Sequence, residues 1–391
     1  MGVVREPVRS RIIPALATIK KPWAGDSESR LRYHEAMNKL TSGSIALALC
    51  TFLVTATALL VAPVNEAAEH GVITLYHHVA NDTPPSTTIS PADFRAHLEY
   101  LRDNEFTVIP LTEMIEKLQR QEPLPDKAVA ITFDDGYISI YDTAFPMLQE
   151  FGFPFTLFLS TGPIDANQPN YMNWDQIRDM SEAGVIIANH MVEHPYMLDR
   201  QPGESERAWL ERRREELLTA EAAIERETGQ SHRYLAYPYG EYNLAIKEML
   251  DEEGFVGLAQ NSGAAGYHSD FLAVPRYPLA SIYANLDTAS TKLESLAFNV
   301  RQVSPDTPVT NSRSPSATLQ FSPGQYNYSQ IGCFANSEPL TMNWLDRDAG
   351  LLELNPQREF DGRRWRYICT APLPGSGRYF WYSVQWINPD D

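Results

Sequence analysis

Two adjacent aspartates, Asp134 and Asp135, follow a short apolar run in the segment ITFDDGY at residues 131–137. Neighbouring carboxylates repel each other, and taking either out of water is costly unless a positive group or a proton compensates. One interpretation is a plain turn from a strand into a loop, with aspartate as the turn former and Gly136 adopting an unusual dihedral. The other is a chemical site in which one aspartate binds a cation, and the cation offsets the repulsion from its neighbour.

A second cluster of reactive side chains lies in the segment NHMVEH, where His190 and His194 are four residues apart. One helical turn at this spacing would place both imidazoles on the same side. Neutral imidazole is the commonest metal ligand, and two imidazoles with one carboxylate suit a divalent cation. Two solvent-facing histidines are the alternative. Because both clusters follow strand-like runs, we favour a metal site.

A third segment, YLAYPYGEYN at residues 234–243, follows another strand-like run. Its proline and glycine shape a loop whose backbone N–H groups can point inward, and such fixed donors are what an oxyanion requires. A structural turn is the alternative interpretation. If the three strands share one sheet, the three segments belong to a single site.

The elements that must position these segments alternate along the chain from residue 71 onward. A helix is expected in SPADFRAHLEYLRDNEF, with Ser90 as its N-cap and Pro91 at its first position. The long segment 204–229, rich in Glu and Arg, is predicted to be a solvated outer helix. The predicted strands are GVITLYHHV, FTVIPL, AVAITF, FTLFLS, GVIIANH, RYLAYP and FVGLAQ. This alternation predicts a parallel α/β barrel or a doubly wound sheet, in which catalytic groups gather at the carboxyl ends of strands.

The composition is that of a folded, acidic protein. The chain has 391 residues, 43% of them hydrophobic, and a net charge of −18 at pH 7, which argues against nucleic acid and anionic membrane surfaces as partners. Residues 301–317, rich in Ser, Pro and Thr, are predicted to be a linker. Beyond them, RRWRYICTAPLPGSGRYFWYSVQWINPDD predicts a β-hairpin in a small β-rich domain at residues 318–391. Its aromatic residues could pack a core or form a sugar-stacking surface.

Residues 45–62 form an uncharged apolar run that begins shortly after Lys39. This pattern predicts a secretory signal peptide or an uncleaved membrane anchor within residues 1–70, with cleavage expected near residue 68. We therefore expect an exported protein, in the periplasm, at the cell surface or outside the cell. In an oxidising compartment Cys333 and Cys369 are expected to form a disulfide, and two buried free thiols are the alternative.

The segments TFDDGY, HMVEH and YPYG, in this order and spacing, resemble the polysaccharide deacetylases of the NodB-homology group, carbohydrate esterase family 4. The segments LYHHV and YPYGEYN look most like the subgroup that includes exported poly-N-acetylglucosamine deacetylases. The resemblance implies a distorted (β/α) barrel over residues 71–300 and a divalent metal. Zinc is the usual metal of the family, and cobalt, nickel and manganese also accept this ligand set.

Transferred by position, the resemblance assigns Asp134 as the general base and Asp135, His190 and His194 as the metal ligands. It also assigns the backbone N–H of Tyr239 to the oxyanion. The implied activity is metal-dependent hydrolysis of N-acetyl groups on an exported N-acetylglucosamine polysaccharide. Peptidoglycan or xylan-ester deacetylation is an alternative, and so is a non-catalytic polysaccharide-binding protein with a degenerate barrel. Membrane contact is expected only through an uncleaved N-terminal anchor.

The sequence departs from the family pattern at three points. Asn189 stands where many relatives carry Ser or Thr before the first histidine. The third motif lacks the arginine that orients the base, and Arg276 in AVPRYP is the expected substitute. The late Leu-x-His motif that supplies the general acid has no counterpart. We expect His77 in LYHHV to take that role, with His78 as the alternative.

Overall fold

The strand that precedes the two aspartates lies at the centre of the main sheet. The computed structural model describes residues 67–391, and within this range the sheet has nine strands. Its paired strands run in the order β11-β10-β9-β8-β7-β2-β12, with β13 added to β2 and β5 added to β7. The strands are β2 (His70–Tyr76), β5 (Thr107–Val108), β7 (Ala128–Phe133), β8 (Phe155–Leu159), β9 (Ile186–Asn189), β10 (Tyr234–Ala236), β11 (Val256–Leu258), β12 (Ala265–Gly266) and β13 (Tyr277–Pro278).

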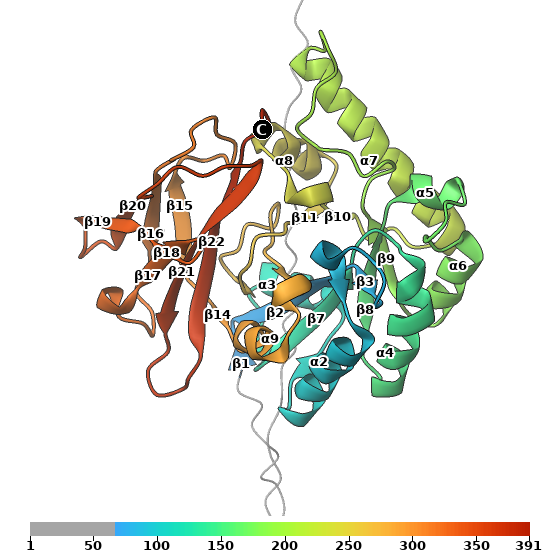
Figure 1. Ribbon diagram of the computed structural model, residues 1–391, viewed down its shortest axis with the longest axis horizontal. Helices are drawn as coiled ribbons and strands as arrows, with labels where there is room; N and C mark the ends of the chain where they lie inside the picture. Colours follow the sequence, from blue (N-terminus) through green and yellow to red (C-terminus); the bar gives the residue numbers. More distant parts are fainter. Residues whose placement is uncertain (1–66) are drawn as a thin grey trace, which may run out of the picture. The chain divides into compact units, whose positions relative to one another are not determined.

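The strands from β2 to β11 on this path are parallel, so their carboxyl ends meet at one edge of the sheet. All six residues of β7 are buried, as the run AVAITF predicts for a parallel strand that is covered on both faces. Among the described strands, the path begins at β11 and ends at β12, and the curled sheet is an open, distorted barrel (Figure 1). The predicted fold class is confirmed.

Helices cover the outer side of the curled sheet, where Figure 1 shows α2, α4, α6 and α7. A π-helical turn, η2 (Ile140–Ala144), leads into α4, and a 3-10 turn, η3 (Pro238–Gly240), follows β10. The described helices are α2 (Pro91–Asp103), α3 (Leu111–Gln119), α4 (Phe145–Phe151), α5 (Thr161–Asp165), α6 (Trp174–Glu182), α7 (Glu206–Thr228), α8 (Leu244–Glu252) and α9 (Leu286–Leu293).

Helix α2 begins as its sequence predicts. The Ser90 side chain accepts a hydrogen bond from the backbone N–H of Asp93 at 3.0 Å, and Pro91 occupies the first helical position. The cap satisfies one of the backbone donors that a helix start leaves free, and proline has no N–H to satisfy there. Ser90 is therefore the N-cap, as expected.

Helix α7 is less solvated than its composition suggests. Ser205 caps its start and Gly229 ends it, close to the predicted limits. One face is buried, however, and carries Trp209, Arg213 and Glu221 into the interior. The prediction of a solvated outer helix is therefore wrong for this face, because Arg213 and Glu221 are buried and hydrogen-bonded there.

The C-terminal part of the chain folds into two antiparallel-rich sheets with their own apolar core. One has the order β14-β22-β21-β17-β18 and the other the order β15-β16-β20-β19. Their strands are β14 (Leu296–Ala297), β15 (Val300–Ser304), β16 (Ala317–Phe321), β17 (Gly332–Ala335), β18 (Glu338–Pro339), β19 (Thr341–Asp346), β20 (Leu351–Asn355), β21 (Arg364–Pro372) and β22 (Tyr379–Ile387). The first residues of the segment expected as a linker, 301–304, thus lie in β15, which pairs with β16.

Strands β21 and β22 form the predicted hairpin, antiparallel along nine residue pairs. Cys333 in β17 and Cys369 in β21 stand directly opposite each other and form a disulfide. The expected cysteine pairing is confirmed. The disulfide ties β17 to the strand whose first residue, Arg364, comes near the candidate site.

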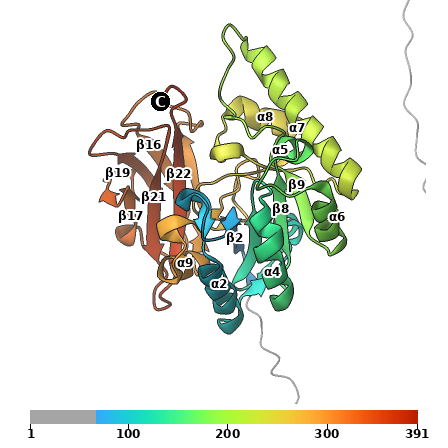
Figure 2. The same ribbon diagram turned by 45° about the vertical axis from the view of Figure 1, so that its right-hand side comes forward.

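The C-terminal sheets pack against the barrel through β22, which Figures 1 and 2 both show on the side toward the barrel. Trp381 of β22 packs against the barrel core, and its indole N–H donates to Ser262 at 3.2 Å. The Ser383 hydroxyl lies 3.0 Å from that of Ser262. The two parts therefore share a packed and hydrogen-bonded interface.

The apolar run at residues 45–62, predicted to be a signal peptide or anchor, lies outside the described residues, as does almost all of the segment 1–70. Two further sheets have two short strands each. One pairs β1 (Ala67–Ala68) with β6 (Leu124–Pro125), and the other pairs β3 (His78–Val79) with β4 (Thr88–Ile89). Among the helices in residues 67–391, none combines the length and apolar character needed to cross a membrane.

Candidate active site

Asp134 is buried at the end of β7 and bound on both carboxylate oxygens by one arginine. Arg276 donates to Oδ1 at 2.7 Å and to Oδ2 at 2.8 Å, and both side chains are fully buried. Its remaining Nε–H donates to the backbone carbonyl of Ala259 at 3.0 Å, which orients the guanidinium plane. The structure thus places Arg276 where an orienting partner of Asp134 must lie.

The charge state of Asp134 follows from these contacts. Burial raises the pKa of a carboxyl group, but the charge of Arg276 and the hydrogen bonds that it donates outweigh burial and hold the pKa of Asp134 below its ordinary value. Asp134 is therefore ionised at neutral pH. A buried carboxylate with a two-point arginine contact has one fixed orientation.

The Asp135 side chain points away from Arg276 and toward His190 and His194, because its backbone is in the left-handed region. Its φ is 75°, and Gly136 follows with a φ of 91°. A side chain at Gly136 would be strained by this φ, and its Cβ would lie 2.9 Å from the Leu159 side chain. The order Asp-Asp-Gly is therefore required for the turn that sends the two carboxylates in different directions.

His190 and His194 converge on Asp135. Their Nε2 atoms lie 3.2 Å and 3.3 Å from the Asp135 Oδ1 atom, and the candidate ligand atoms all fall within 4.8 Å of one another. The expected route, one helical turn, is wrong. Residues 190–194 form an irregular loop, in which Met191 and His194 have φ values of 68° and 51°.

The donor atoms of this cluster fit a divalent cation. The Nδ1 atom of His190 lies 2.7 Å from the carbonyl oxygen of Ala236, so Nδ1 carries the proton and the Nε2 lone pair faces Asp135. His190 Nε2 and Asp135 Oδ1 are buried and have no hydrogen-bond partner among the described residues. Burial lowers the pKa of His194 to about 4, which keeps this second imidazole neutral. Two imidazoles and one carboxylate are a suitable set for zinc and similar metals, which bind imidazole in its neutral form.

Asn189 has a structural explanation. Its side-chain N–H groups donate to Glu221 and to the carbonyl of Leu217, both on α7, at 3.0 Å. Its oxygen accepts from the backbone N–H of Met191 at 2.8 Å. The amide thus anchors the start of the histidine loop to α7, and this departure from the family pattern leaves the cluster in place.

The loop after β10 brings Tyr239 to the cluster. Tyr239 has a φ of 57°, and its ring lies edge-on to His194 with the ring centroids 4.4 Å apart. Gly240 follows with a φ of 72°, and a Cβ there would lie 2.9 Å from Gln260. Only glycine allows that close approach at this φ. The third predicted segment therefore reaches the same site as the other two.

The two neighbouring histidines of the first strand have different surroundings. His78 is buried and stacks on Tyr137 at 3.6 Å, so packing accounts for it. His77 directly follows β2 and is half-buried. Burial raises the pKa of Asp135, and the neighbouring histidines, His77 among them, lower it below its ordinary value. His77 thus lies close enough to act electrostatically on the site.

Several residues beside the cluster carried no recognisable signal in the sequence. Tyr196 stacks on Tyr239 with centroids 4.1 Å apart, and Arg364 of β21 lies 5.0 Å over the Tyr239 ring. Arg213 of α7 holds the histidine loop by donating to the carbonyls of Tyr196 and Met197 at 2.8 and 3.1 Å. Their partners are distant in sequence, so no local pattern marks them.

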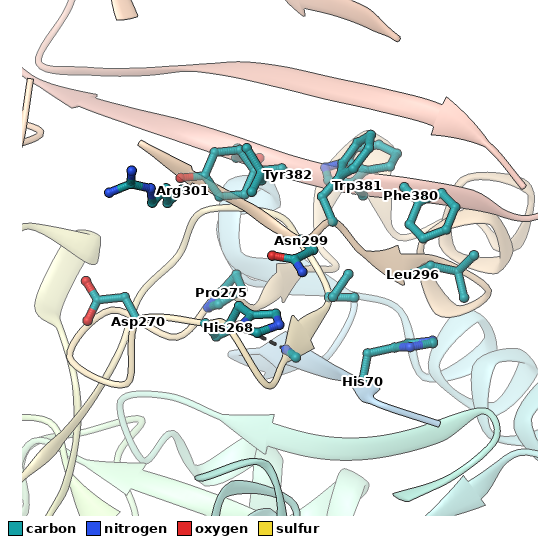
Figure 3. Close-up of a pocket in the computed structure, with 18 of the residues that line it drawn as sticks. His70, His268, Asp270, Pro275, Leu296, Asn299, Arg301, Phe380, Trp381 and Tyr382 are labelled. Atoms are coloured by element: carbon teal, nitrogen blue, oxygen red, sulfur yellow. Dashed lines mark hydrogen bonds between the residues drawn. The ribbon is translucent and has the colours of Figure 1, made fainter. Parts of the chain in front are cut away.

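A larger hollow lies away from this cluster. A groove of about 820 Å³ lies between the barrel and the C-terminal sheets. Figure 3 shows His70, His268 and Trp381 among the residues that line it. Asp134, Asp135, His190 and His194 are not part of its lining. The candidate site is therefore defined by its converging side chains and not by cavity size.

An Asp-His-His cluster that could hold a metal ion lies beside an arginine-bound carboxylate, at the carboxyl edge of a parallel barrel. This arrangement is typical of metal-dependent hydrolases. Residues 121–257 match the family described as polysaccharide deacetylase. The chain carries a polysaccharide deacetylase domain of the NodB-homology type.

Two relatives and two solved structures show what this domain is similar to. The YxkH protein of Bacillus subtilis is 24% identical over 52% of this chain and 69% of its own length. The poly-beta-1,6-N-acetyl-D-glucosamine N-deacetylase of Escherichia coli K12 is 24% identical over 53% of this chain, but the match spans only 36% of that enzyme. The Streptococcus pyogenes deacetylase PplD, solved with acetate, gives a TM-score of 0.52 at 20% identity, covering 57% of this chain and 98% of PplD. IcaB from Ammonifex degensii gives 0.51 at 25% identity, covering 58% and 97%.

Proposed function

We propose that this protein is a metal-dependent hydrolase that removes N-acetyl groups from a polysaccharide containing N-acetylglucosamine. The observation that carries the proposal is the convergence of Asp135, His190 and His194 beside Asp134, whose carboxylate is bound by Arg276. The polysaccharide deacetylase domain and the similarity to the E. coli poly-beta-1,6-N-acetyl-D-glucosamine N-deacetylase support the reaction and the substrate class.

In this proposal Asp135 Oδ1 and the Nε2 atoms of His190 and His194 hold one divalent cation, with zinc as the first candidate and cobalt, nickel or manganese as alternatives. When bound, such a cation supplies Lewis acidity, which polarises an amide carbonyl and lowers the pKa of water. The Ala236 carbonyl fixes the tautomer of His190 and so presents its lone pair to the site.

Asp134 is the proposed general base. It is ionised, buried, and held by two hydrogen bonds from Arg276, so it can remove a proton from water without first reorienting. Each Asp134 oxygen keeps a second lone pair that can accept the proton. Asp134 is not among the residues whose ligand atoms converge, which are Asp135, His190 and His194. The two adjacent carboxylates therefore have separate roles.

Tyr239 and His77 complete the proposed set. The backbone N–H of Tyr239 stabilises the oxyanion that forms when water adds to the acetamide carbon. The amine then leaves after it gains a proton, which His77 donates from the end of β2. The products are acetate and a free amine on the sugar.

The proposal places the protein outside the cytoplasm. The apolar run at residues 45–62 acts as a signal peptide or an anchor, the deacetylase domain occupies residues 71–300, and the β-rich domain follows at 318–391. N-terminal sequencing of the mature protein should find a start near residue 69 if the run is cleaved. An intact N-terminus on protein free in the cytosol would contradict export.

Acetate release tests the function directly. Purified, zinc-loaded protein should release acetate from poly-β-1,6-N-acetylglucosamine oligomers, and a chelator should stop the release. Chitin oligomers, peptidoglycan and acetylated xylan form the comparison panel. Faster release from peptidoglycan or xylan would replace the proposed substrate. Binding to the polymer without acetate release, in the metal-loaded protein, would point to a non-catalytic polysaccharide-binding protein.

A further inference from the structure

The C-terminal sheet reaches the candidate site through a buried carboxylate. Glu241, in the loop after Tyr239, has a fully buried side chain. Arg363 donates to its two carboxylate oxygens from Nε at 2.6 Å and from Nη2 at 2.9 Å, and Arg364 donates to Oε1 at 3.0 Å. A carboxylate without water needs such partners, so Glu241 depends on two residues more than 120 positions away.

The same two arginines cover an aromatic pair beside a proposed metal ligand. Tyr196 and Tyr239 stack with their rings 4.1 Å apart and 10° from parallel. Arg363 lies 4.5 Å from the Tyr196 centroid and Arg364 lies 5.0 Å from the Tyr239 centroid, both within cation–π range. The Tyr239 ring in turn contacts His194. A continuous chain of contacts therefore runs from β21 to the metal-ligand cluster.

The backbone at the end of this chain is strained. Tyr239 and His194 both have φ near +50° to +60°, in the left-handed region that bulky residues rarely adopt. Such conformations persist only where surrounding contacts hold them. The opposite side of the loop is held as well, because Gly240 lies against Gln260 and Arg366 of β21 donates to the Gln260 carbonyl at 3.2 Å.

We infer that the C-terminal sheet is a working part of the deacetylase site, in which Arg363 and Arg364 are positioning residues. Through Glu241 and the Tyr196–Tyr239 stack, they hold the loop that carries the backbone N–H of Tyr239. The inference rests on the proposed function, since it assigns these arginines to the oxyanion-binding loop of that reaction. They act through the loop and do not contact the reacting atoms.

Arg364→Ala tests the positioning role with a matched control. Arg358 belongs to the same C-terminal part and, like Arg364, combines an ion pair with a cation–π interaction: it pairs with Glu338 at 2.9 Å and lies 5.7 Å over the Phe360 ring. Arg364→Ala should lower kcat about 10- to 100-fold with little change in KM, because a displaced oxyanion donor weakens mainly the transition state. Arg364→Lys keeps a cation over the ring and should recover part of kcat. Arg358→Ala should match the wild-type protein.

Hydrogen exchange gives a readout that does not need activity. The backbone N–H groups of Gly240 and Glu241 bond within the loop, to the carbonyls of Tyr237 and Pro238. In the metal-loaded protein, a peptide covering residues 234–243 should exchange faster in Arg364→Ala than in the wild-type protein or in Arg358→Ala. If Arg364→Ala exchanges faster but the wild-type protein releases no acetate, the result would support the contact between Arg364 and the loop and reject the proposed function.

Three results would overturn the inference. The first is an Arg364→Ala variant with wild-type kcat and wild-type exchange in residues 234–243. The second is a rise in KM at unchanged kcat, which would make Arg364 a substrate contact. The third is an equal loss of kcat in Arg358→Ala, with a similar fall in Tm, which would show a general loss of stability in the C-terminal sheets.

Discussion

Arg276 binds Asp134, which lies 142 residues earlier in the chain, through hydrogen bonds of 2.7 and 2.8 Å to the two carboxylate oxygens. The guanidinium also donates to Thr132 at 3.2 Å and to the Ala259 carbonyl at 3.0 Å. This relationship makes the proposed base both ionised and fixed in direction. It also supplies the orienting arginine that the third motif lacks.

Replacing Arg276 should separate orientation from charge. Arg276→Lys keeps a positive charge but loses the planar two-point contact, so kcat should fall at least about tenfold while metal content stays unchanged. Arg276→Met leaves Asp134 buried without a partner and should destabilise the protein by about 3–5 kcal/mol. Steady-state kinetics and urea unfolding measure the two effects, with the exposed Arg120→Lys as the control. Normal kcat in Arg276→Lys would show that Asp134 needs no fixed orientation.

The metal ligands and the base should respond differently to substitution. His190→Ala and His194→Ala each remove a ligand atom and should lower the metal content well below about one ion per chain. Asp134→Asn leaves all three ligands and should retain the metal while turnover is lost. Elemental analysis after dialysis and acetate release measure the two properties. Near-normal turnover in Asp134→Asn would rule out Asp134 as the base.

His77→Ala tests the proposed general acid. A positioned acid contributes about 100- to 10,000-fold to a proton transfer, so turnover should fall by at least about tenfold, with about one metal ion still bound. His268→Ala, which changes an exposed histidine, is the control. A loss of metal would make His77 a ligand, and a large fall in Tm would make it a packing residue. Unchanged kinetics would leave solvent or a substrate group as the proton donor.

His97 should make folding stability depend on pH. Burial lowers its pKa from 6.5 to about 4, and its ring lies 2.7 Å from the Ala284 carbonyl and 3.0 Å from the Tyr76 hydroxyl. Because the folded-state pKa lies below the unfolded one, the unfolded chain binds the extra proton. Neutral, buried His97 therefore contributes fully to the free energy of unfolding above pH 6.5, and this contribution is lost as the pH falls toward about 4.

Between pH 7 and pH 5 the loss from His97 alone should be about 2 kcal/mol. His97→Gln removes the titrating group, so its free energy of unfolding should fall by about 2 kcal/mol less than that of the wild-type protein over the same interval. Urea unfolding at the two pH values measures the difference, and other buried histidines cancel in the comparison. Equal losses in both proteins would show that His97 does not titrate between its folded and unfolded values.

The parts of the fold that depend on neighbours in sequence could be predicted. The run AVAITF indicates a buried strand, Ser90 and Pro91 indicate a helix start, and both are found. The β21–β22 hairpin also follows a local pattern. The Cys333–Cys369 pair was expected from the predicted export and is found. Hydrophobic periodicity, caps and turns act over a few residues, so the linear order of side chains is enough to show them.

The same reasoning located the chemical groups but not their geometry. Asp134, Asp135, His190 and His194 are recognisable because their types and spacing follow strand ends. The irregular loop from His190 to His194 was mistaken for a helical turn, since the spacing of four suits both. Its left-handed residues are held by contacts from α7, such as Arg213, which the local sequence does not reveal.

By itself, the sequence indicated a parallel α/β barrel or doubly wound sheet, the residues that could bind a cation, and a β-hairpin at the C-terminus. The family resemblance of its motifs then favoured the barrel and named the candidate base. The sequence named Arg276 as the candidate partner of the base, and the tertiary structure shows the two-point contact with Asp134. Only the tertiary structure decided that Arg363, just before β21, and Arg364, in β21, bind Glu241. These pairs lie more than 100 residues apart in sequence. Each ion pair exists because packing of the whole chain removes water from both partners in one place, and no short-range pattern encodes that meeting.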